Sequence, residues 1–350
     1  MKNLTEAYTL VALTDQNAAQ WDEFVLSEPT GSVHQLSSWV EFQTKIPGRE
    51  VAKGFGVRDK KGDFVATVIC VQMDTGFLGK KWWYSARGPV VNMQKNAAAA
   101  EFLFRMVKRN LTQHGGMFWR VDPYFSETDW QRILDLETKP AVQNYQPTDT
   151  LMLDLTKSDE ELLKEMKRKG RYNIKQAQKH EIKYEVYADG KFTKEALQQF
   201  WDLNIATTDR DGFSGHQKEY YRHFLRSLPE TAVLFLAKKD ETPVAAAIST
   251  FAGSKAIYYF GASTSDNALR KLMAPYGLQW RMIQYAKEKG CKTYDFLGIA
   301  PEGEENHPYA GISEFKWKFG GYRDTFVAGK EIPLNGFWYW VYRVMKKLRK

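Results

Sequence analysis

The sequence predicts an α/β (α+β) protein of two similar modules, each a mixed sheet flanked by helices. Three observations lead to this fold class. The chain has 350 residues, which favours about two domains. Its composition, 43% hydrophobic and 26% charged, is that of a globular protein rather than a disordered one. The same order of strand and helix patterns occurs once in each half of the chain.

The first copy of this order begins with a hairpin pattern. An apolar run at 63–72 is followed by a second strand pattern at 81–90 that ends in a glycine turn. A helical pattern at about 96–114 then ends at Gly115, and an apolar strand pattern follows at 117–123. This half therefore reads as hairpin, helix and buried strand.

The second copy has the same elements in the same order. Strand patterns at 243–251 and 255–263 are followed by a helical pattern at about 273–288, which ends at Gly290. An apolar strand pattern at 291–296 completes the copy. This is the element order of a GNAT-like acyltransferase module, so the sequence predicts twin GNAT-like modules.

We expect the first GNAT-like module to comprise residues 1–150 and a C-terminal tail at about 317–350. The second would comprise residues 151–316. Helical stretches at 157–180 and about 193–208 connect the two repeated patterns, and neither contains a sustained heptad run.

Charge and cysteine content restrict the partners and the compartment. The net charge is +8 and the pI is about 9.1, which favours anionic partners such as nucleic acid, a phosphorylated substrate or a membrane surface. Cys70 and Cys291 have no metal-ligand spacing and are interpreted as reduced, structural residues of a cytoplasmic protein. The chain start lacks the apolar core of a signal peptide, and no window has the ~20 apolar residues of a spanning helix.

The most informative segment is 309–321, where Phe315 and Lys316 precede a Phe-Gly-Gly turn, together with Tyr-Asp-Phe-Leu-Gly at 294–298. It resembles the C-terminal signature of the FemABX peptidyltransferases, and the chain is similar to those members that lack a coiled-coil arm. The resemblance implies a twin-module fold over nearly the whole chain. It also implies transfer of an amino acid from aminoacyl-tRNA onto the stem-peptide amine of a peptidoglycan precursor, lipid- or UDP-linked.

A motif that the sequence lacks restricts the class of acyl donor. An acetyl-CoA enzyme needs a glycine-rich turn whose N–H groups hold the pyrophosphate, and neither 87–94 nor 264–276 has that spacing. An acyl-CoA donor is therefore disfavoured. Because aminoacyl-tRNA is already an activated ester, we expect no further cofactor and no metal. An acyltransferase using acyl-CoA or acyl-carrier protein remains an alternative, as does a non-catalytic RNA- or membrane-binding protein.

Two residues are predicted to be catalytic. Lys316 would stabilise the oxyanion, and Lys318, on the same face of an expected strand, is the second choice. Asp122 ends an apolar strand, would face a cleft between the modules, and is the candidate acid or base; its counterpart Asp295 is interpreted as structural or substrate-positioning. The alternatives are a solvated lysine on a half-buried strand and a turn-forming aspartate before Pro123.

The resemblance also suggests substrate-binding residues. Phe315 and Lys318 belong to the signature segment. Trp39 lies in a segment similar to the family's Gln-x-x-x-Trp, but the phosphate-contacting lysine expected after it is absent, and Lys45 is the nearest cation.

Three further binding candidates lie in the second half. His216 occupies the place of a phosphate-binding arginine in relatives, and Tyr220 follows it on the same segment. Tyr259 matches an aromatic position near the acceptor. The alternative interpretation is a helix surface for the first two and core packing for Tyr259.

Two basic stretches are candidates for contact with RNA or with a membrane. The stretch 164–179 is an amphipathic helical pattern that could follow RNA backbone or form a solvated face. In the tail, 337–350, aromatic residues precede five cations: Arg343, Lys346, Lys347, Arg349 and Lys350. We expect the tail to contact an anionic membrane peripherally at the inner face of the plasma membrane; a helix capping the first module is the alternative.

Overall fold

A computed structural model describes residues 6–76, 78–133 and 136–348. Two compact units form: one contains residues 1–148 and 325–350, and the other contains residues 149–324. The sequence analysis placed the last boundary at about 316/317. Residues 317–324 instead belong to the second unit, because β14 (Tyr322–Thr325) pairs with β8 (Asp149–Asp154) in the second sheet.

The first unit is built on an eight-stranded mixed sheet. Its order is β1 (Thr9–Ala12), β2 (Ala52–Arg58), β3 (Phe64–Asp74), β4 (Lys81–Ala86), β6 (Phe118–Asp122), β15 (Lys330–Pro333) and β7 (Lys139–Pro140), with β5 (Val90–Val91) paired to β3. Strands β4 and β6 run parallel, and the other pairs among the described strands are antiparallel. The C-terminal strand β15 thus lies inside this sheet rather than beside it.

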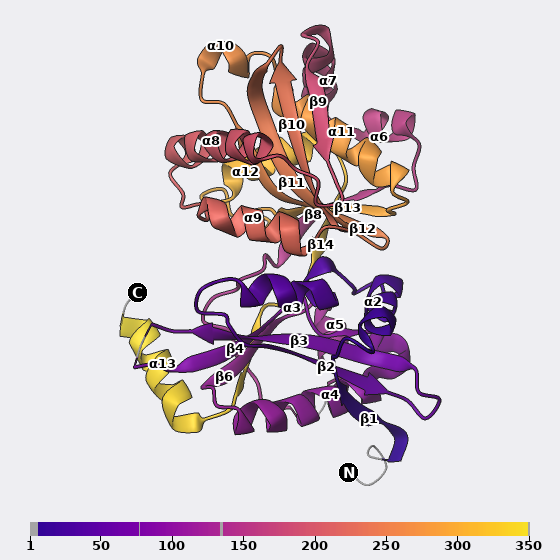
Figure 1. The fold of residues 1–350 in the computed structure, drawn as a ribbon, viewed down its shortest axis with the longest axis vertical. Helices are drawn as coiled ribbons and strands as arrows, with labels where there is room; N and C mark the ends of the chain where they lie inside the picture. Colours follow the sequence, from indigo (N-terminus) through magenta and orange to yellow (C-terminus); the bar gives the residue numbers. More distant parts are fainter. Residues whose placement is uncertain (1–5, 77, 134–135, 349–350) are drawn as a thin grey trace. The chain divides into compact units, whose positions relative to one another are not determined.

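Helices cover both faces of this sheet. In Figure 1, α2 (Ala18–Ser27) and α3 (Ser37–Thr44) lie over one face, and α4 (Met93–Gln113) lies over the other. The Asn92 side chain begins α4 by accepting hydrogen bonds from the N–H groups of Gln94 and Lys95. The short α5 (Glu127–Trp130) follows β6.

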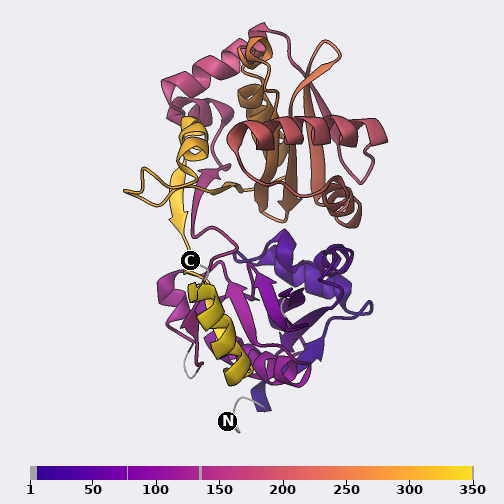
Figure 2. The ribbon, with the colours of Figure 1, turned by 90° about the vertical axis from the view of Figure 1, so that its left-hand side faces the viewer.

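The last helix, α13 (Gly336–Leu348), packs on the first unit, and Figure 2 shows it in yellow beside the strands of that unit. Tyr339 is buried, and the ring of Tyr342 lies 4.6 Å from that of Phe118. Glu331 of β15 forms a buried ion pair with Arg120 of β6 and accepts a 2.9 Å hydrogen bond from Tyr339 Oη. Arg349 and Lys350 of the predicted basic tail lie outside the described residues.

The second unit repeats this arrangement with a seven-stranded sheet. Its order is β14, β8, β13 (Thr293–Gly298), β12 (Lys255–Ser263), β11 (Thr242–Ala252), β10 (Ala232–Lys239) and β9 (Lys183–Tyr187). The parallel pair β12–β13 corresponds to β4–β6, and α11 (Ala274–Glu288) connects its strands as α4 does in the first unit. The predicted twin mixed sheets flanked by helices are confirmed.

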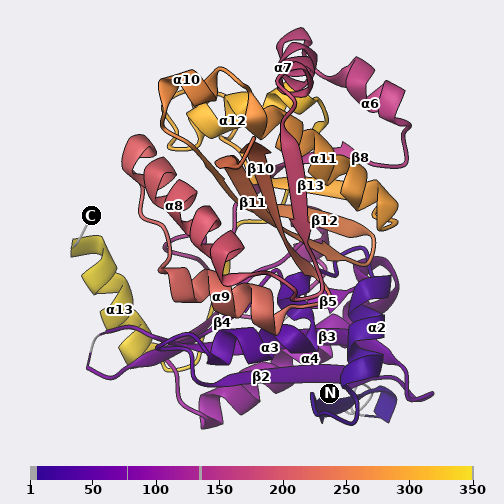
Figure 3. The ribbon, with the colours of Figure 1, turned by 45° about the horizontal axis from the view of Figure 1, so that its top comes forward.

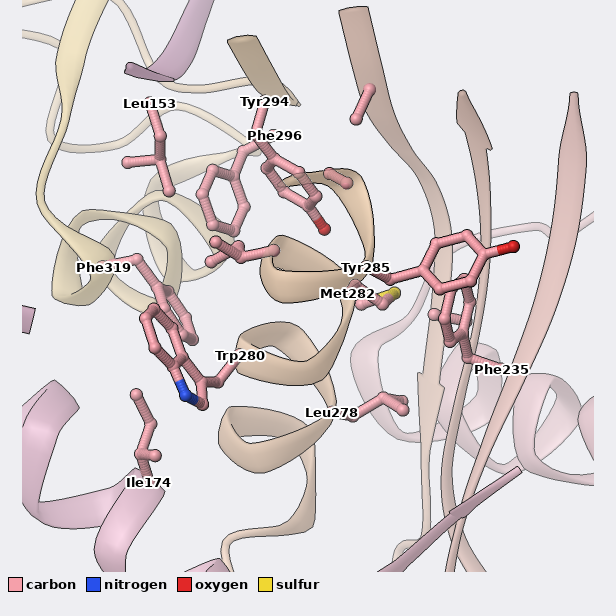
Figure 4. Packing of buried hydrophobic residues seen from close by; sticks show 14 of the residues in the cluster. Leu153, Ile174, Phe235, Leu278, Trp280, Met282, Tyr285, Tyr294, Phe296 and Phe319 are labelled. Carbon is pink, nitrogen blue, oxygen red and sulfur yellow. The ribbon is translucent and has the colours of Figure 1, made fainter. Parts of the chain in front are cut away.

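Helices α8 (Lys194–Asp211) and α9 (Lys218–Ser227) pack on one face of this sheet (Figure 3). Helix α11 packs on β10 and β11 and contacts α7 (Arg168–Lys179). Figure 4 shows the core between them, where Met282 and Leu278 of α11 are buried together with Phe235. The remaining helices are α6 (Asp159–Glu165), α10 (Asn267–Arg270), α12 (Ala310–Lys316) and the 3₁₀ helix η2 (Trp317–Phe319).

No helix in the described part of the chain is long and apolar enough to cross a membrane. Cys70 and Cys291 are buried in separate units and are not joined to each other.

Candidate active site

The signature segment forms a helix and not the strand that the sequence analysis expected. Helix α12 ends at Lys316 and continues directly into η2. The packing explains the error: Phe315 and Phe319 share one helical side and pack against the Tyr276 ring, at 5.0 and 5.8 Å. Lys316 and Lys318, two residues apart, therefore point in different directions instead of sharing a strand face.

Lys316 points into the second unit. The residue is 5% exposed, and its Nζ donates a 2.6 Å hydrogen bond to the carbonyl oxygen of Gly298. Burial lowers the pKa of Lys316 to about 8, against the opposing field of the Asp295 carboxylate. The alternative of a solvated lysine is thereby excluded, and the catalytic role of Lys316 stays a prediction.

The acceptor of this hydrogen bond is positioned by the end of β13. Asp295 is fully buried, and its Oδ1 accepts a 2.7 Å hydrogen bond from the N–H of Leu297. Leu297 has a φ of 59°, a conformation that is uncommon for a branched side chain. The carboxylate therefore fixes the turn that presents the Gly298 carbonyl to Lys316.

Aromatic residues and a second lysine lie next to Lys316 along the chain. Phe315 is half-buried between Tyr276 and Phe319. Lys318 lies 6.0 Å from the Tyr276 ring and forms a 3.0 Å ion pair with Glu314, whose own side chain is exposed. The segment thus combines one buried amine, one partly exposed amine and a stack of rings.

Asp122 belongs to the first unit, so the two predicted catalytic groups do not share one unit. It is 3% exposed, and its Oδ2 accepts hydrogen bonds from Tyr84 Oη (2.8 Å) and from the N–H groups of Tyr145 (3.2 Å) and Gln146 (3.1 Å). Its Oδ1 has no hydrogen-bond partner in the described part of the chain. Burial raises the pKa of Asp122, although the hydrogen bond from Tyr84 opposes the shift.

Three predicted binding residues come together in the second unit. The His216 and Tyr220 rings are stacked at 3.8 Å, and both meet the edge of Phe260, at 6.1 and 6.3 Å. Tyr259 lies 4.8 Å from Phe260 and 5.0 Å from Phe224. Because His216 is exposed while Phe224 is buried, this cluster reaches from the core to the surface.

The two binding candidates of the first unit lie at α3. Trp39 is 4% exposed and packs against His34 (4.7 Å) and Phe42 (5.1 Å). Lys45 follows the helix, is exposed, and forms an ion pair with Glu41. Trp39 is therefore a core residue in this structure, whereas Lys45 is accessible.

The basic helix α7 also has a structural task. Arg171 Nη1 donates to the carbonyl oxygens of Leu163 and Met166 at the end of α6. No group of three or more His, Cys, Asp or Glu suited to a metal ion occurs among the residues that the structure describes.

Sequence reasoning missed two parts of this site. The Gly298 carbonyl could not be found, because a backbone acceptor leaves no residue-type signal. Tyr276 was visible only as part of an Ala-Pro-Tyr helix start, where Pro275 has a sufficient structural explanation.

Comparison with known proteins identifies the family. The model of the FemAB family matches residues 16–134, 129–240 and 237–347. The chain belongs to the FemAB family. A relative from Staphylococcus haemolyticus, named Lipid II:glycine glycyltransferase, is 24% identical over 396 aligned residues, which cover 90% of this chain and 91% of the relative. The prediction of a FemABX-type transferase is confirmed.

Solved structures agree on the fold. The crystal structure of FemX superposes with a TM-score of 0.83 at 22% identity, covering 97% of this chain and all of that one. A tandem GNAT protein from the clavulanic acid biosynthesis pathway gives a TM-score of 0.55 at 11% identity, covering 94% of this chain and 99% of the other. The FemAB chain described here therefore has a tandem GNAT-like fold.

Proposed function

We propose that this chain transfers an amino acid from aminoacyl-tRNA onto the stem-peptide amine of a peptidoglycan precursor. Its relatives carry the name Lipid II:glycine glycyltransferase, which supports an acceptor of the peptidoglycan precursor class. The observation that carries the proposal is Lys316, a buried amine beside an aromatic stack at the segment that resembles the family signature.

The proposed reaction is aminolysis of an ester. The acceptor nitrogen attacks the ester carbonyl carbon, the carbonyl oxygen gains negative charge, and the tRNA ribose oxygen leaves with a proton as the amide forms. Lys316 would place its ammonium charge next to that oxyanion. With a pKa of about 8 it is mostly protonated at neutral pH, while burial keeps the surrounding dielectric low.

Asp122 is the proposed acid or base. Its Oδ2 is held by three donors, so its Oδ1 would exchange a proton with the acceptor amine. The raised pKa brings this carboxyl nearer to the working range of a general base.

Substrate binding is assigned by chemistry. Phe315 and Lys318 would hold the donor. The Phe315 ring would stack on a base or ribose face, and the Lys318 ammonium would contact a phosphate. The acceptor would contact the cluster of His216, Tyr220 and Tyr259, and the first-unit candidates Trp39 and Lys45 are the weaker part of this proposal. The activated ester supplies the driving force, so no further cofactor is invoked.

We place this reaction at the cytoplasmic face of the plasma membrane, with the chain bound peripherally. The acceptor would be lipid- or UDP-linked, and the amino acid transferred is left open.

The test is a donor assay with radiolabelled aminoacyl-tRNA and either acceptor form. We expect transfer that ribonuclease abolishes, and a loss of at least about 100-fold in kcat in Lys316→Met. Transfer from an acyl-CoA without RNA, or unchanged kcat in Lys316→Met, would refute the proposal.

A further inference from the structure

Two neighbouring elements of the first unit each expose large apolar side chains. On α13, Phe337 and Trp340 are 64% and 62% exposed, and Leu348 is 82% exposed. On the turn between β3 and β4, Leu78 is 70% exposed. The hairpin and the helix are neighbours, because Lys80 Nζ lies 4.1 Å from the centroid of the Trp338 ring (Figure 3).

The exposed apolar residues of α13 lie on one side of the helix. Phe337, Trp340 and Leu348 are exposed and, with the half-buried Val344, are spaced by three and four residues. The opposite side is held by the unit: Tyr342 Oη accepts a 2.8 Å hydrogen bond from Arg120, and Tyr339 bonds to Glu331. The helix is therefore fixed in place with an apolar face turned outward.

Within the β3–β4 turn and α13 the charges have one sign, and the exposed Asp74, opposite Lys81 at the base of the hairpin, is the acidic residue that precedes the turn. Neither 75–81 nor 334–350 contains an acidic residue. Lys346 and Lys347 are exposed at the end of α13. A cavity of about 350 Å³ lies between the hairpin and the start of α13, and Lys80, Lys81, His114 and Trp338 are among its lining residues. Cationic side chains thus lie near both ends of the helix, with Lys347 flanking the apolar face and Lys346, four residues after Tyr342, nearer the packed side.

We propose that the β3–β4 turn and α13 form a surface that docks onto an anionic lipid bilayer. Phe337, Trp340, Val344, Leu348 and Leu78 would enter the boundary between headgroups and acyl chains. The lysines would meet lipid phosphates, with the cavity receiving a headgroup.

A bilayer fits this surface better than a protein partner does. Lysine is depleted in protein–protein interfaces, whereas tryptophan beside lysine is typical of a membrane interface. A 13-residue helix is too short to span a bilayer but suits lying in its surface. The inference deepens the location proposed above by naming the surface, and it rests on the proposed function only for its purpose.

The experiment is co-sedimentation of the full chain with vesicles of phosphatidylglycerol and phosphatidylcholine, and with phosphatidylcholine alone. We expect binding to the anionic vesicles, weakened by high salt. Phe337→Ser with Trp340→Ser, and separately Leu78→Asn, should lower the partition coefficient about tenfold or more. Leu78→Asn suits the φ of 47° at this turn.

Lys346→Glu with Lys347→Glu is a second test, because both side chains are exposed and the fold does not depend on them. It should reduce binding to anionic vesicles and leave the small binding to neutral vesicles unchanged. Tyr172→Ser, on α7 and 58% exposed, is the matched control and should bind like the wild type.

Three results would overturn the inference: no binding by the wild-type chain, equal binding to neutral vesicles, or equal binding by the Phe337/Trp340 and Lys346/Lys347 double variants. The result is independent of catalysis, because transfer to a soluble UDP-linked acceptor is measured in parallel. Failure of that transfer with intact vesicle binding would count against the proposed function and not against this surface.

Discussion

At Lys316 the chain keeps an amine where water has little access, and this has a consequence for stability. The unfolded chain retains the proton up to a pH of about 10.5, but the folded chain releases it at about 8. Between these values the unfolded state binds more protons, so the free energy of unfolding rises with pH. Below pH 8 the buried charge lowers the free energy of unfolding, a cost that is consistent with the catalytic role proposed for Lys316.

Lys316→Met should remove this pH dependence. We expect the free energy of unfolding of the wild type to rise relative to that of the variant by about 2 kcal/mol between pH 8 and pH 10. Urea unfolding at the two pH values measures it, and Lys289→Met, at a more exposed amine, is the control. A constant difference between wild type and Lys316→Met would mean that the amine is not held in a desolvated site.

Two substitutions of Asp122 distinguish a structural role of this carboxylate from a catalytic one. Asp122→Ala leaves Tyr84 Oη and two N–H groups without an acceptor and should lower the free energy of unfolding by about 2–4 kcal/mol. Asp122→Asn keeps an oxygen for these donors, so stability should change by less than about 1 kcal/mol. If Asp122 is the base, kcat in Asp122→Asn still falls about 100-fold; an unchanged kcat would leave it only its structural role.

Among the elements, the contact between α7 and η2 positions the signature segment. A Cβ at Gly170 would lie 2.2 Å from the carbonyl oxygen of Lys318, so only glycine allows this approach. Because η2 continues α12, a shift here would move Lys316.

Gly170→Ala should therefore destabilise the second unit by about 2 kcal/mol and lower kcat. The control is Gly311→Ala on α12, where a Cβ would meet nothing within 4 Å. It should stabilise the helix by about 0.5–1 kcal/mol. Thermal unfolding followed by circular dichroism compares them, and equal behaviour would contradict the close contact.

The elements that the sequence predicts are those whose signal is local. Long apolar runs and a 3.6-residue period identify β3, β11, α4 and α11 from the residues themselves. At 315–319 the two periods conflict: Phe315, Trp317 and Phe319 alternate with lysines as in a strand, but Phe315 and Phe319 are also spaced as in a helix. Five residues are too few to decide, and the packing against Tyr276 decides it.

The site was predictable to the same extent. Lys316 and the rings of Phe315 and Phe319 follow from the family-like segment, whereas the burial of the amine and the contact with Tyr276 do not. The Gly298 acceptor depends on the left-handed backbone at Leu297, which follows from the whole fold.

For the whole molecule, the two units differ in how the chain builds them. The second unit is continuous, whereas the first needs β15 and α13 from the end of the chain. We expect a fragment of residues 149–324 to unfold cooperatively and a fragment of residues 1–148 not to do so, because β6 would lack its partner β15. Circular dichroism with heating measures this; a cooperatively folded 1–148 fragment would contradict it.

The position of β15 between β6 and β7 also bears on biosynthesis. During translation, residues 149–324 are synthesised before β15, the strand that completes the first sheet. The second unit can therefore fold while the first unit is still incomplete. A product terminated before β15 would leave the edge of β6 open, a feature that favours aggregation. Translation through β15 is therefore needed to complete the first sheet.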